Sequence, residues 1–223
     1  MIDWSPLLIT FKLAFITTIC LIILGIPLAY WLAYTKNKLK AIIETLVSMP
    51  LVLPPTVLGF YFLIAFSPQN AFGNWLDTYW GIHLIFSFEG LIIGSIIYSL
   101  PFMVHPIQAG FSSVPKNLLE ASQLLGKSKF TTLTSVLLPS IKSSLITGIV
   151  LSFAHTIGEF GLVLMIGGNI PNKTKVASIA IYEEVESLNY AAANSYSLIL
   201  FTITFIILLM VYLLNNKSIK NIF

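Results

Sequence analysis

Long apolar runs alternate with short polar segments along this chain. Crossing the roughly 30 Å hydrocarbon core of a bilayer as a helix takes about 20 apolar residues. Five runs are long enough: Leu13–Tyr34, Thr45–Phe66, Gly90–Phe111, Ser143–Ile166 and Ser195–Leu214. Because backbone amides in lipid must find partners within their own segment, these runs predict helices. The pattern therefore predicts an all-α, polytopic membrane helix bundle, with one domain over residues 1–223.

Two segments between the runs are not simple loops. Asn70–Phe88 contains four aromatic side chains, Trp75, Tyr79, Trp80 and Phe86, which suits a helix or turn lying at the membrane interface. Ala177–Ala193 is rich in alanine and carries an acidic patch, so it is either a short extra helix or a re-entrant segment. We therefore expect five or six transmembrane helices.

The composition excludes a soluble globular domain. The chain is 57% hydrophobic and only 9% charged, whereas soluble domains carry about 25% charged residues. The lone cysteine, Cys20, cannot form a disulfide or a thiolate metal site within the chain. His83, His105 and His155 are dispersed, so we expect no metal site, and the pattern favours a lipid rather than a nucleic-acid partner.

The placement of lysines predicts the orientation, since all twelve basic residues are lysine. Three groups lie on one side: Lys36, Lys38 and Lys40; Lys116, Lys127, Lys129 and Lys142; and Lys217 and Lys220. On the other side, Lys173 and Lys175 are accompanied by Glu183, Glu184 and Glu186. Because cytoplasmic loops carry an excess of lysine and arginine, we expect the N-terminus outside and the C-terminus in the cytoplasm. The loop at about residues 112–142 is then cytoplasmic.

A polar segment between the third and fourth runs has a distinctive spacing. It reads Glu120-Ala121-Ser122, then Gly126 after three residues, then Val136-Leu137-Leu138-Pro139 after nine more. This spacing closely resembles the EAA loop of ABC-importer membrane subunits, E-A-A-x3-G-x9-I-x-L-P, with Ser122 and Val136 as mild departures. The resemblance implies a cytoplasmic loop that docks on an ATP-hydrolysing subunit. The residues it assigns to this coupling loop are Glu120, Ala121, Ser122, Gly126, Leu138 and Pro139.

The same loop contains a near match to a phosphate-binding pattern at Gly126-Lys127-Ser128. The first glycine of G-x4-G-K-[ST] is missing, and that pattern belongs between a strand and a helix. Leucines recur here near helical spacing, Pro115 suits a first helical turn, and Gly126 suits a C-terminal cap. The segment therefore predicts a short helix rather than a nucleotide site.

Prolines interrupt two of the apolar runs. The second run carries Pro50, Pro54 and Pro55, followed by Thr56, and the third carries Pro101 and Pro106. Proline removes an amide donor and clashes with the preceding turn. Such breaks are either kinks tolerated by packing or segments that line or hinge a translocation path. The density of prolines favours the second interpretation for the second run.

The fourth run ends in a second distinctive motif. Gly158-Glu159-Phe160-Gly161 is followed by Gly167-Gly168-Asn169-Ile170-Pro171, Lys173-Thr174 and Ala180-Ile181-Tyr182. This closely resembles permeases for tetrahedral oxyanions, the molybdate permeases most of all. Leu51-Val52-Leu53-Pro54-Pro55 and Pro106-Ile107-Gln108-Ala109-Gly110-Phe111 extend the resemblance over nearly the whole chain. Sulfate permeases share the G-E-F-G region and are the nearest alternative.

Glu159 is the only full charge within the five runs. An intramembrane carboxylate is costly, so it needs a protein or water partner, and His155 lies one turn earlier on the same face. Since a carboxylate repels a dianion, Glu159 is either an anchor for close packing at Gly158 and Gly161 or a gate contact. The pathway or gate candidates are Pro54, Pro55, Thr56, Ser152, Thr156, Gly158, Glu159 and Gly161.

The resemblance implies a type I ABC importer permease fold and a non-enzymatic permease subunit that carries molybdate, or tungstate, by alternating access. It implies a homodimer in the cytoplasmic (inner) membrane, two ATPase subunits that bind ATP-Mg, and no cofactor in this chain. The runs carry hydroxyls but neither lysine nor arginine, so we expect an extracytoplasmic molybdate-binding protein to recognise the anion. A sulfate/thiosulfate permease and, from another class, an ion-coupled secondary carrier are the alternatives.

Overall fold

The computed structural model describes the backbone of residues 3–220 and the side chains of residues 3–213. Within these residues all regular structure is helical, which confirms the all-α prediction. The elements are α1 (Ser5–Tyr34), α2 (Leu39–Val52), α3 (Pro55–Phe66), α4 (Ala71–Trp80), α5 (Phe88–Ser113), α6 (Lys116–Leu124), α7 (Lys129–Thr132), the π-helical η1 (Leu133–Leu137), α8 (Leu138–Ser140), α9 (Lys142–Ile157), α10 (Gly161–Gly167), α11 (Ala177–Glu186) and α12 (Tyr190–Lys220). Lys217 and Lys220, used above for the orientation, lie outside the described side chains.

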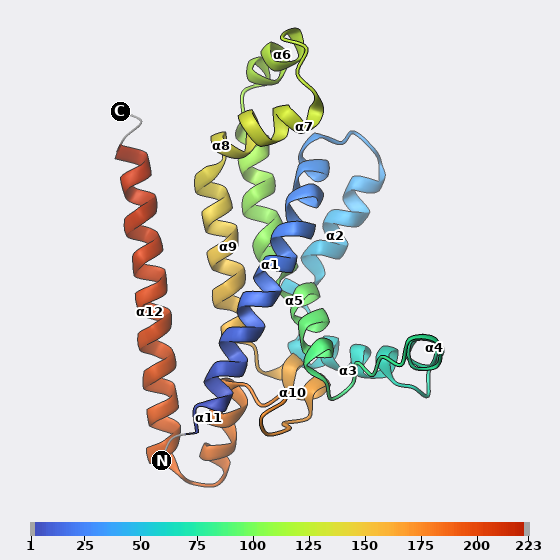
Figure 1. Ribbon diagram of the computed structural model, residues 1–223, viewed down its shortest axis with the longest axis vertical. Helices are drawn as coiled ribbons and strands as arrows, with labels where there is room; N and C mark the ends of the chain where they lie inside the picture. Colours follow the sequence, from blue (N-terminus) through green and yellow to red (C-terminus); the bar gives the residue numbers. More distant parts are fainter. Residues whose placement is uncertain (1–2, 221–223) are drawn as a thin grey trace.

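Helices α1, α5 and α9 form the centre of the bundle, and each packs against the other two. Helix α2 packs on α5, whereas α12 lies at the side and contacts α9 and α11 (Figure 1). A large apolar cluster fills the space between α1, α2, α5 and the π-helical turn. Its fully buried members include Leu21, Leu32, Met103, Ile107, Phe111 and Leu137.

Three helices are long and apolar enough to cross a membrane on their own: α1, α5 and the Tyr190–Leu213 part of α12. Helix α5 continues through Pro101 and Pro106 without interruption. Two further pairs would span only as bent units. The three long helices overlap the first, third and fifth predicted runs, the first bent pair overlaps the second run, and only the α9 half of the second bent pair overlaps the fourth.

The second predicted span, Thr45–Phe66, is not one helix. It is split into α2 and α3, and the chain bends by 114° between the two helices. Leu53 adopts an extended conformation directly before Pro54, as expected because proline disfavours the helical conformation of the residue before it. Pro50, by contrast, lies inside α2. The break therefore lies at Leu53–Pro54 and turns α3 across the bundle.

The fourth predicted span, Ser143–Ile166, is also divided. Helix α9 ends at Ile157, and α10 begins at Gly161 as a separate short helix. Before it, Lys129–Ser140 meets α9 at 79°. The apolar run alone could not show this break, because hydrophobicity continues through α10 while the backbone changes direction at Gly158–Phe160.

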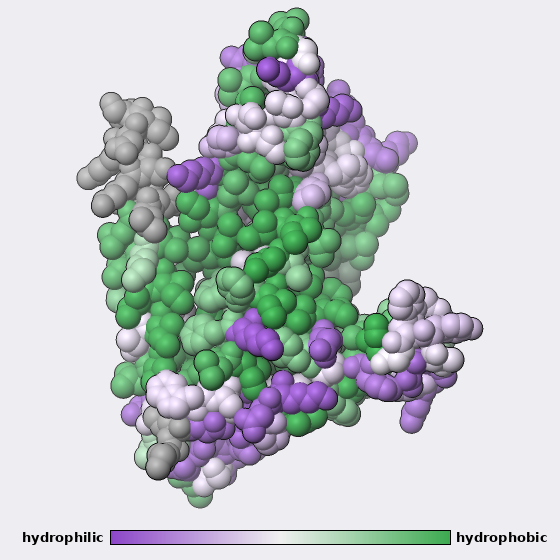
Figure 2. All heavy atoms as spheres, in the orientation of Figure 1, coloured by the Kyte–Doolittle hydropathy of each residue, from purple (hydrophilic) through white to green (hydrophobic). Residues whose placement is uncertain are grey.

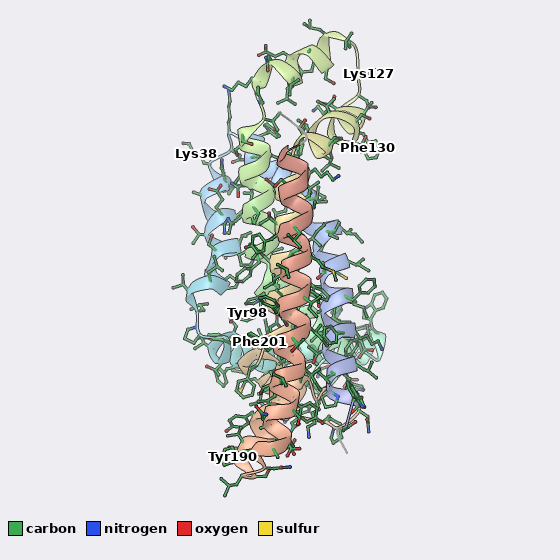
Figure 3. All side chains as sticks on the ribbon, turned by 90° about the vertical axis from the view of Figure 1, so that its left-hand side faces the viewer. Lys38, Tyr98, Lys127, Phe130, Tyr190 and Phe201 are labelled. Atoms are coloured by element: carbon green, nitrogen blue, oxygen red, sulfur yellow. The ribbon has the colours of Figure 1, made fainter. Side chains whose placement is uncertain are left out.

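On the face seen in Figure 2, polar residues gather toward the two ends of the long axis and on the α4 projection, and the surface between them is mainly apolar. Lys38 and Lys127 lie near one end and Tyr190 near the other (Figure 3). The lysine-bearing α1–α2 connection thus shares an end with the α6–α7 loop. The opposite end carries α4, with exposed Trp75, Tyr79 and Trp80, and α11.

A buried hydrogen bond closes that opposite end. The Thr10 hydroxyl donates to the Pro6 carbonyl at 2.7 Å and accepts the Ala177 amide at 2.7 Å. Helix α11, which begins at Ala177, has only 10 residues and is too short to cross a bilayer. The Ala177–Ala193 segment is therefore a short extra helix followed by the start of α12, which begins before the predicted Ser195.

Candidate functional site

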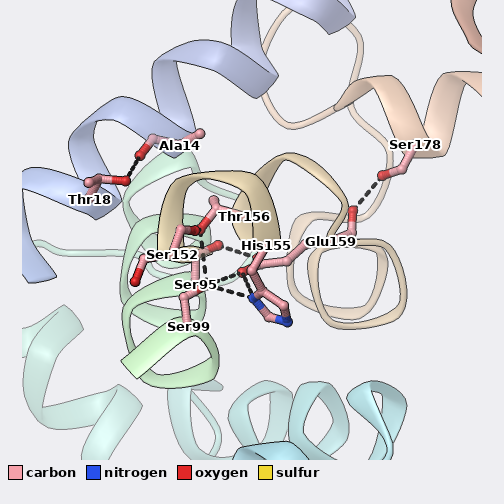
Figure 4. A network of polar contacts seen from close by, with 9 residues as sticks. All are labelled: Ala14, Thr18, Ser95, Ser99, Ser152, His155, Thr156, Glu159 and Ser178. Carbon is pink, nitrogen blue, oxygen red and sulfur yellow. Dashed lines mark hydrogen bonds and ion pairs between the residues drawn. The ribbon is translucent and has the colours of Figure 1, made fainter. Parts of the chain in front are cut away.

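Glu159 lies in a buried polar network at the end of α9 (Figure 4), and the whole residue is only 3% exposed. Ser95 donates to its Oε2 at 2.5 Å and Ser99 to its Oε1 at 2.9 Å, both from α5. His155 Nδ1 lies 3.7 Å from Oε1. The backbone carbonyl of Glu159 accepts from Ser178 of α11 at 2.5 Å. Glu159 therefore joins the end of α9 to the middle of α5 and the start of α11.

The network continues along α9. Ser99 Oγ also lies 2.8 Å from His155 Nδ1 and 3.0 Å from Thr156 Oγ1. Thr156 donates to the Ser152 carbonyl at 3.0 Å, while the buried hydroxyl of Ser152 has no hydrogen-bond partner among the described residues. The His155 ring stacks on Phe102, with 4.1 Å between the ring centroids. Thr156 is thus part of the Glu159 network, and Ser152 contributes to it only through its backbone.

A cavity of about 500 Å³ opens beside this network. The residues that line it include Pro55, Thr56, Gly158, Glu159 and Gly161. The sharp turn into α3 and the break after α9 therefore bring together two groups of predicted residues that lie about a hundred positions apart. Pro54, Ser152 and Thr156 do not line the cavity; Pro54 caps α3.

The two glycines of the G-E-F-G motif differ in their surroundings. A Cβ on Gly161 would lie 3.2 Å from Thr56 Cγ2 and 3.3 Å from Pro55 Cβ, so a larger residue here would push α10 and α3 apart by a few tenths of an ångström. A Cβ on Gly158 would meet nothing closer than 3.6 Å. The expectation of close packing thus holds at Gly161, but it is wrong at Gly158, which lies where α9 ends and the chain turns.

The motif after α10 forms a compact loop around one buried side chain. Thr174 Oγ1 donates to the Gly167 carbonyl at 2.6 Å and accepts the Ile170 amide at 3.0 Å. Gly168 takes a left-handed conformation, with φ 67°. Thr174 is fully buried. The G-G-N-I-P-x-K-T pattern is therefore explained by loop geometry, because the threonine satisfies two backbone groups that the turn leaves free.

The residues predicted for a coupling loop lie on the α6–α8 segment, which projects from the lysine-bearing end (Figure 1). Helix α6 ends in a Schellman motif, in which Gly126 N donates to Gln123 O and Lys127 N to Ser122 O, with Gly126 at φ 68°. The predicted helix with a Gly126 cap is confirmed. Ser122 is buried and shares a 2.7 Å hydrogen bond with Thr132 of α7.

The surface of this projection is unusually apolar for a polar loop. Leu124, Leu125 and Phe130 are 89%, 75% and 75% exposed. Glu120, Ala121 and Pro139 are also exposed, whereas Leu138 is half-buried where the chain returns to the bundle. Exposed apolar groups of this size, ringed by polar ones, are typical of a protein-binding surface.

A cluster of polar residues between α2 and α5 was not predicted from the sequence. A pocket of about 430 Å³ between α2 and α5 is lined by Glu44, Ser48, His105, Gln108, Ala109 and Ser112. Glu44 was placed just before the second span, but α2 begins at Leu39 and includes it. The spacing of Glu44 and Ser48, and of His105, Gln108 and Ser112, puts each set on one helix face. That spacing was the available signal.

Comparisons with known proteins agree with this geometry. Residues 25–220 match the family described as binding-protein-dependent transport system inner membrane component. A molybdenum transport system permease protein ModB of Azotobacter vinelandii is 43% identical over 86% of this chain and 85% of its own. A probable sulfate transport system permease protein cysT of Zygnema circumcarinatum is 32% identical over 91% of this chain and 70% of its own.

Among solved structures, a bacterial ABC transporter involved in alginate import matches with a TM-score of 0.79. It is 18% identical and covers 96% of this chain and 78% of its own. This likeness shows the fold, that of a type I ABC importer permease. Together with the family match over most of the chain, it shows that this chain belongs to the binding-protein-dependent transport system inner membrane components, the permease subunits of ABC importers.

Proposed function

We propose that this chain forms the translocation path of a molybdate importer, with tungstate as an alternative substrate. The observation that carries the proposal is the 43% identity, over 86% of the chain, to a molybdenum transport permease. The likeness to a sulfate permease is 32%. The charge-poor composition of the apolar helices supports an anion path without a fixed cationic trap, since tight binding inside would slow release.

The α6–α8 projection supports a docking role toward an ATPase. Its exposed Leu124, Leu125 and Phe130 offer an apolar contact surface, and the Glu120–Pro139 segment has the spacing of a coupling loop. In this proposal two copies of the chain pair in the inner membrane and two ATPase subunits bind ATP-Mg. The lysine-bearing end faces the cytoplasm, so the N-terminus lies outside and the C-terminus inside.

The cavity beside Glu159 supports a role in alternating access. Pro55 and Thr56 of α3 line it together with Gly158 and Glu159, so a movement of α3 against the end of α9 would open or close this space. The opposite end, with α4 and α11, would then receive the anion from an extracytoplasmic molybdate-binding protein.

Uptake measurements test the substrate. The chain is produced with its ATPase and binding-protein partners, and radioactive molybdate uptake is measured with tungstate or sulfate as competitor. Strong competition by tungstate and weak competition by sulfate is the expected result. Stronger competition by sulfate would favour the sulfate permease suggested by the cysT relative, and ATP-independent uptake would contradict the importer assignment.

Single cysteines test the orientation. In a Cys20→Ser background, a cysteine at Glu120 is expected to react only from the cytoplasmic side and to cross-link to the ATPase. Lys173→Cys at the opposite end is the matched control and is expected to react from outside. A cysteine at Glu120 that reacts from outside, or never contacts the ATPase, would overturn the coupling role.

A further inference from the structure

The pocket between α2 and α5 presents a polar surface on two otherwise apolar helices. Its lining residues include Glu44, Ser48, His105, Gln108 and Ser112. Polar and ionisable groups at membrane depth normally face a water-filled path or another protein rather than lipid. All five are half-buried or exposed in the single chain, so this surface is accessible to a permeating ion.

The carboxylate of Glu44 is covered at one oxygen. Gln108 Nε2 donates to its Oε1 at 2.5 Å, across from α5. The Lys40 ammonium lies 3.7 Å from the same oxygen. One turn further along α2, Ser48 Oγ lies 3.1 Å from His105 Nε2. The Ser48 hydroxyl itself donates to the Glu44 backbone carbonyl at 2.7 Å. The pocket therefore places Ser48 and His105 beside a carboxylate that already has an amide and an ammonium partner.

A doubly charged tetrahedral oxyanion would be repelled by an uncovered carboxylate at this distance, because like charges repel strongly in a low-dielectric channel. Resting on the function proposed above, we propose that Gln108 is a positioning residue. Its amide holds the Glu44 carboxylate beside Lys40, whose ammonium offsets the negative charge, so that the oxyanion can pass over Ser48 and His105 toward the lysine-bearing end. Glu44 itself supplies structure rather than a contact for the anion.

A double-mutant cycle tests the assignment. Gln108→Met removes the amide donors at nearly constant size, and we expect molybdate uptake below saturation to fall by at least about ten-fold. Glu44→Gln alone is expected to retain uptake. Glu44→Gln/Gln108→Met, which has no carboxylate to cover, is expected to regain it. Gln69→Met makes the same change at an exposed position between α3 and α4, outside the pocket, so it is the matched control and is expected to transport normally.

The outcomes separate the two proposals. Undiminished uptake by Gln108→Met overturns the masking role, and so does a double variant that inserts and binds its ATPase but stays inactive. Recovery in the double variant supports it when Gln108→Met unfolds at the same temperature as the unaltered chain, because the loss of uptake is then not a loss of stability. If the unaltered transporter carries none of molybdate, tungstate or sulfate, the proposed function itself fails and this inference fails with it.

Discussion

Ser99 on α5 donates a 2.9 Å hydrogen bond to the carboxyl group of Glu159, which lies 60 positions later at the exit of α9. With Ser95 at 2.5 Å, it accounts for both carboxyl oxygens. A buried acceptor that loses its donor costs about 1–3 kcal/mol. We therefore expect Ser95→Ala and Ser99→Ala each to lower the free energy of unfolding by about this amount, measured by thermal unfolding in detergent.

The matched control for this pair is Ser152→Ala on α9. Ser152 is equally buried, but its hydroxyl has no hydrogen-bond partner among the described residues. Its removal is expected to leave the unfolding temperature unchanged or slightly raised. A Ser152 variant that is as unstable as Ser99→Ala would show that burial, rather than the bond to Glu159, accounts for the loss.

Glu159→Gln tests whether Glu159 is a structural anchor or a contact of the transport gate. The amide keeps one acceptor oxygen but cannot accept from both serines, so some stability is lost. If Glu159 is an anchor, molybdate uptake is expected to change by less than about ten-fold. A much larger loss of uptake in a variant that inserts and associates normally with its ATPase would instead assign a gating contact. Unchanged transport would end the gate hypothesis.

Gly161 is expected to be far more sensitive to substitution than Gly158. A Cβ at Gly161 would lie within 3.3 Å of both Thr56 and Pro55, whereas at Gly158 the nearest atom is 3.6 Å away. Overpacking typically costs about 1–3 kcal/mol, so Gly161→Ala should lower the unfolding temperature. Gly158→Ala is the control. Equal effects at the two positions would contradict the close approach of α10 to α3.

Gly126→Val tests the coupling loop. A β-branched residue at φ 68° strains the turn between α6 and α7, so we expect normal insertion but reduced ATP-driven uptake. Gly81 has a similar φ of 61° and open space around it, and it lies at the other end of the bundle. Gly81→Val therefore carries the same strain and is expected to retain uptake. Loss of uptake in both variants would indicate general misfolding.

Ser122→Ala restores the alanine that is usual in the EAA pattern. It also leaves Thr132 Oγ1, 2.7 Å away and buried, without its partner, at a cost of about 1–3 kcal/mol. Adding Thr132→Val is expected to recover most of that stability, because both polar groups are then gone. A cycle with no coupling between the two positions, read by thermal unfolding, would argue against the pair.

Local features were predictable from the sequence, and contacts between distant segments were not. The α6 helix with its Gly126 cap follows from neighbouring residues, so the prediction held. For Glu159, spacing along the chain pointed to His155, whereas the donors at 2.5 and 2.9 Å come from α5. Hydroxyls at Ser95 and Ser99 carry no pattern that marks them as partners of a residue so far away.

The breaks within the second and fourth runs were harder to place for another reason. The hydrophobicity of a segment shows which residues suit lipid, but it does not show where the backbone changes direction. Pro54 predicted the first break. The 114° bend between α2 and α3, however, depends on the packing of α3 against α10. Glu44 was missed because the predicted second span begins at Thr45, one residue after it, whereas α2 begins at Leu39.

The hydrogen bond between Thr10 and Ala177 joins residues 167 positions apart. Translation proceeds from the N-terminus, so the first helix enters the membrane long before its partner has been synthesised. The Thr10 hydroxyl can accept the Ala177 amide only after most of the chain has been synthesised. The contact that joins α1 to α11, at the end of the bundle opposite the lysine-bearing loops, therefore forms late in the biogenesis of this protein, and a chain that ends before Ala177 cannot form it.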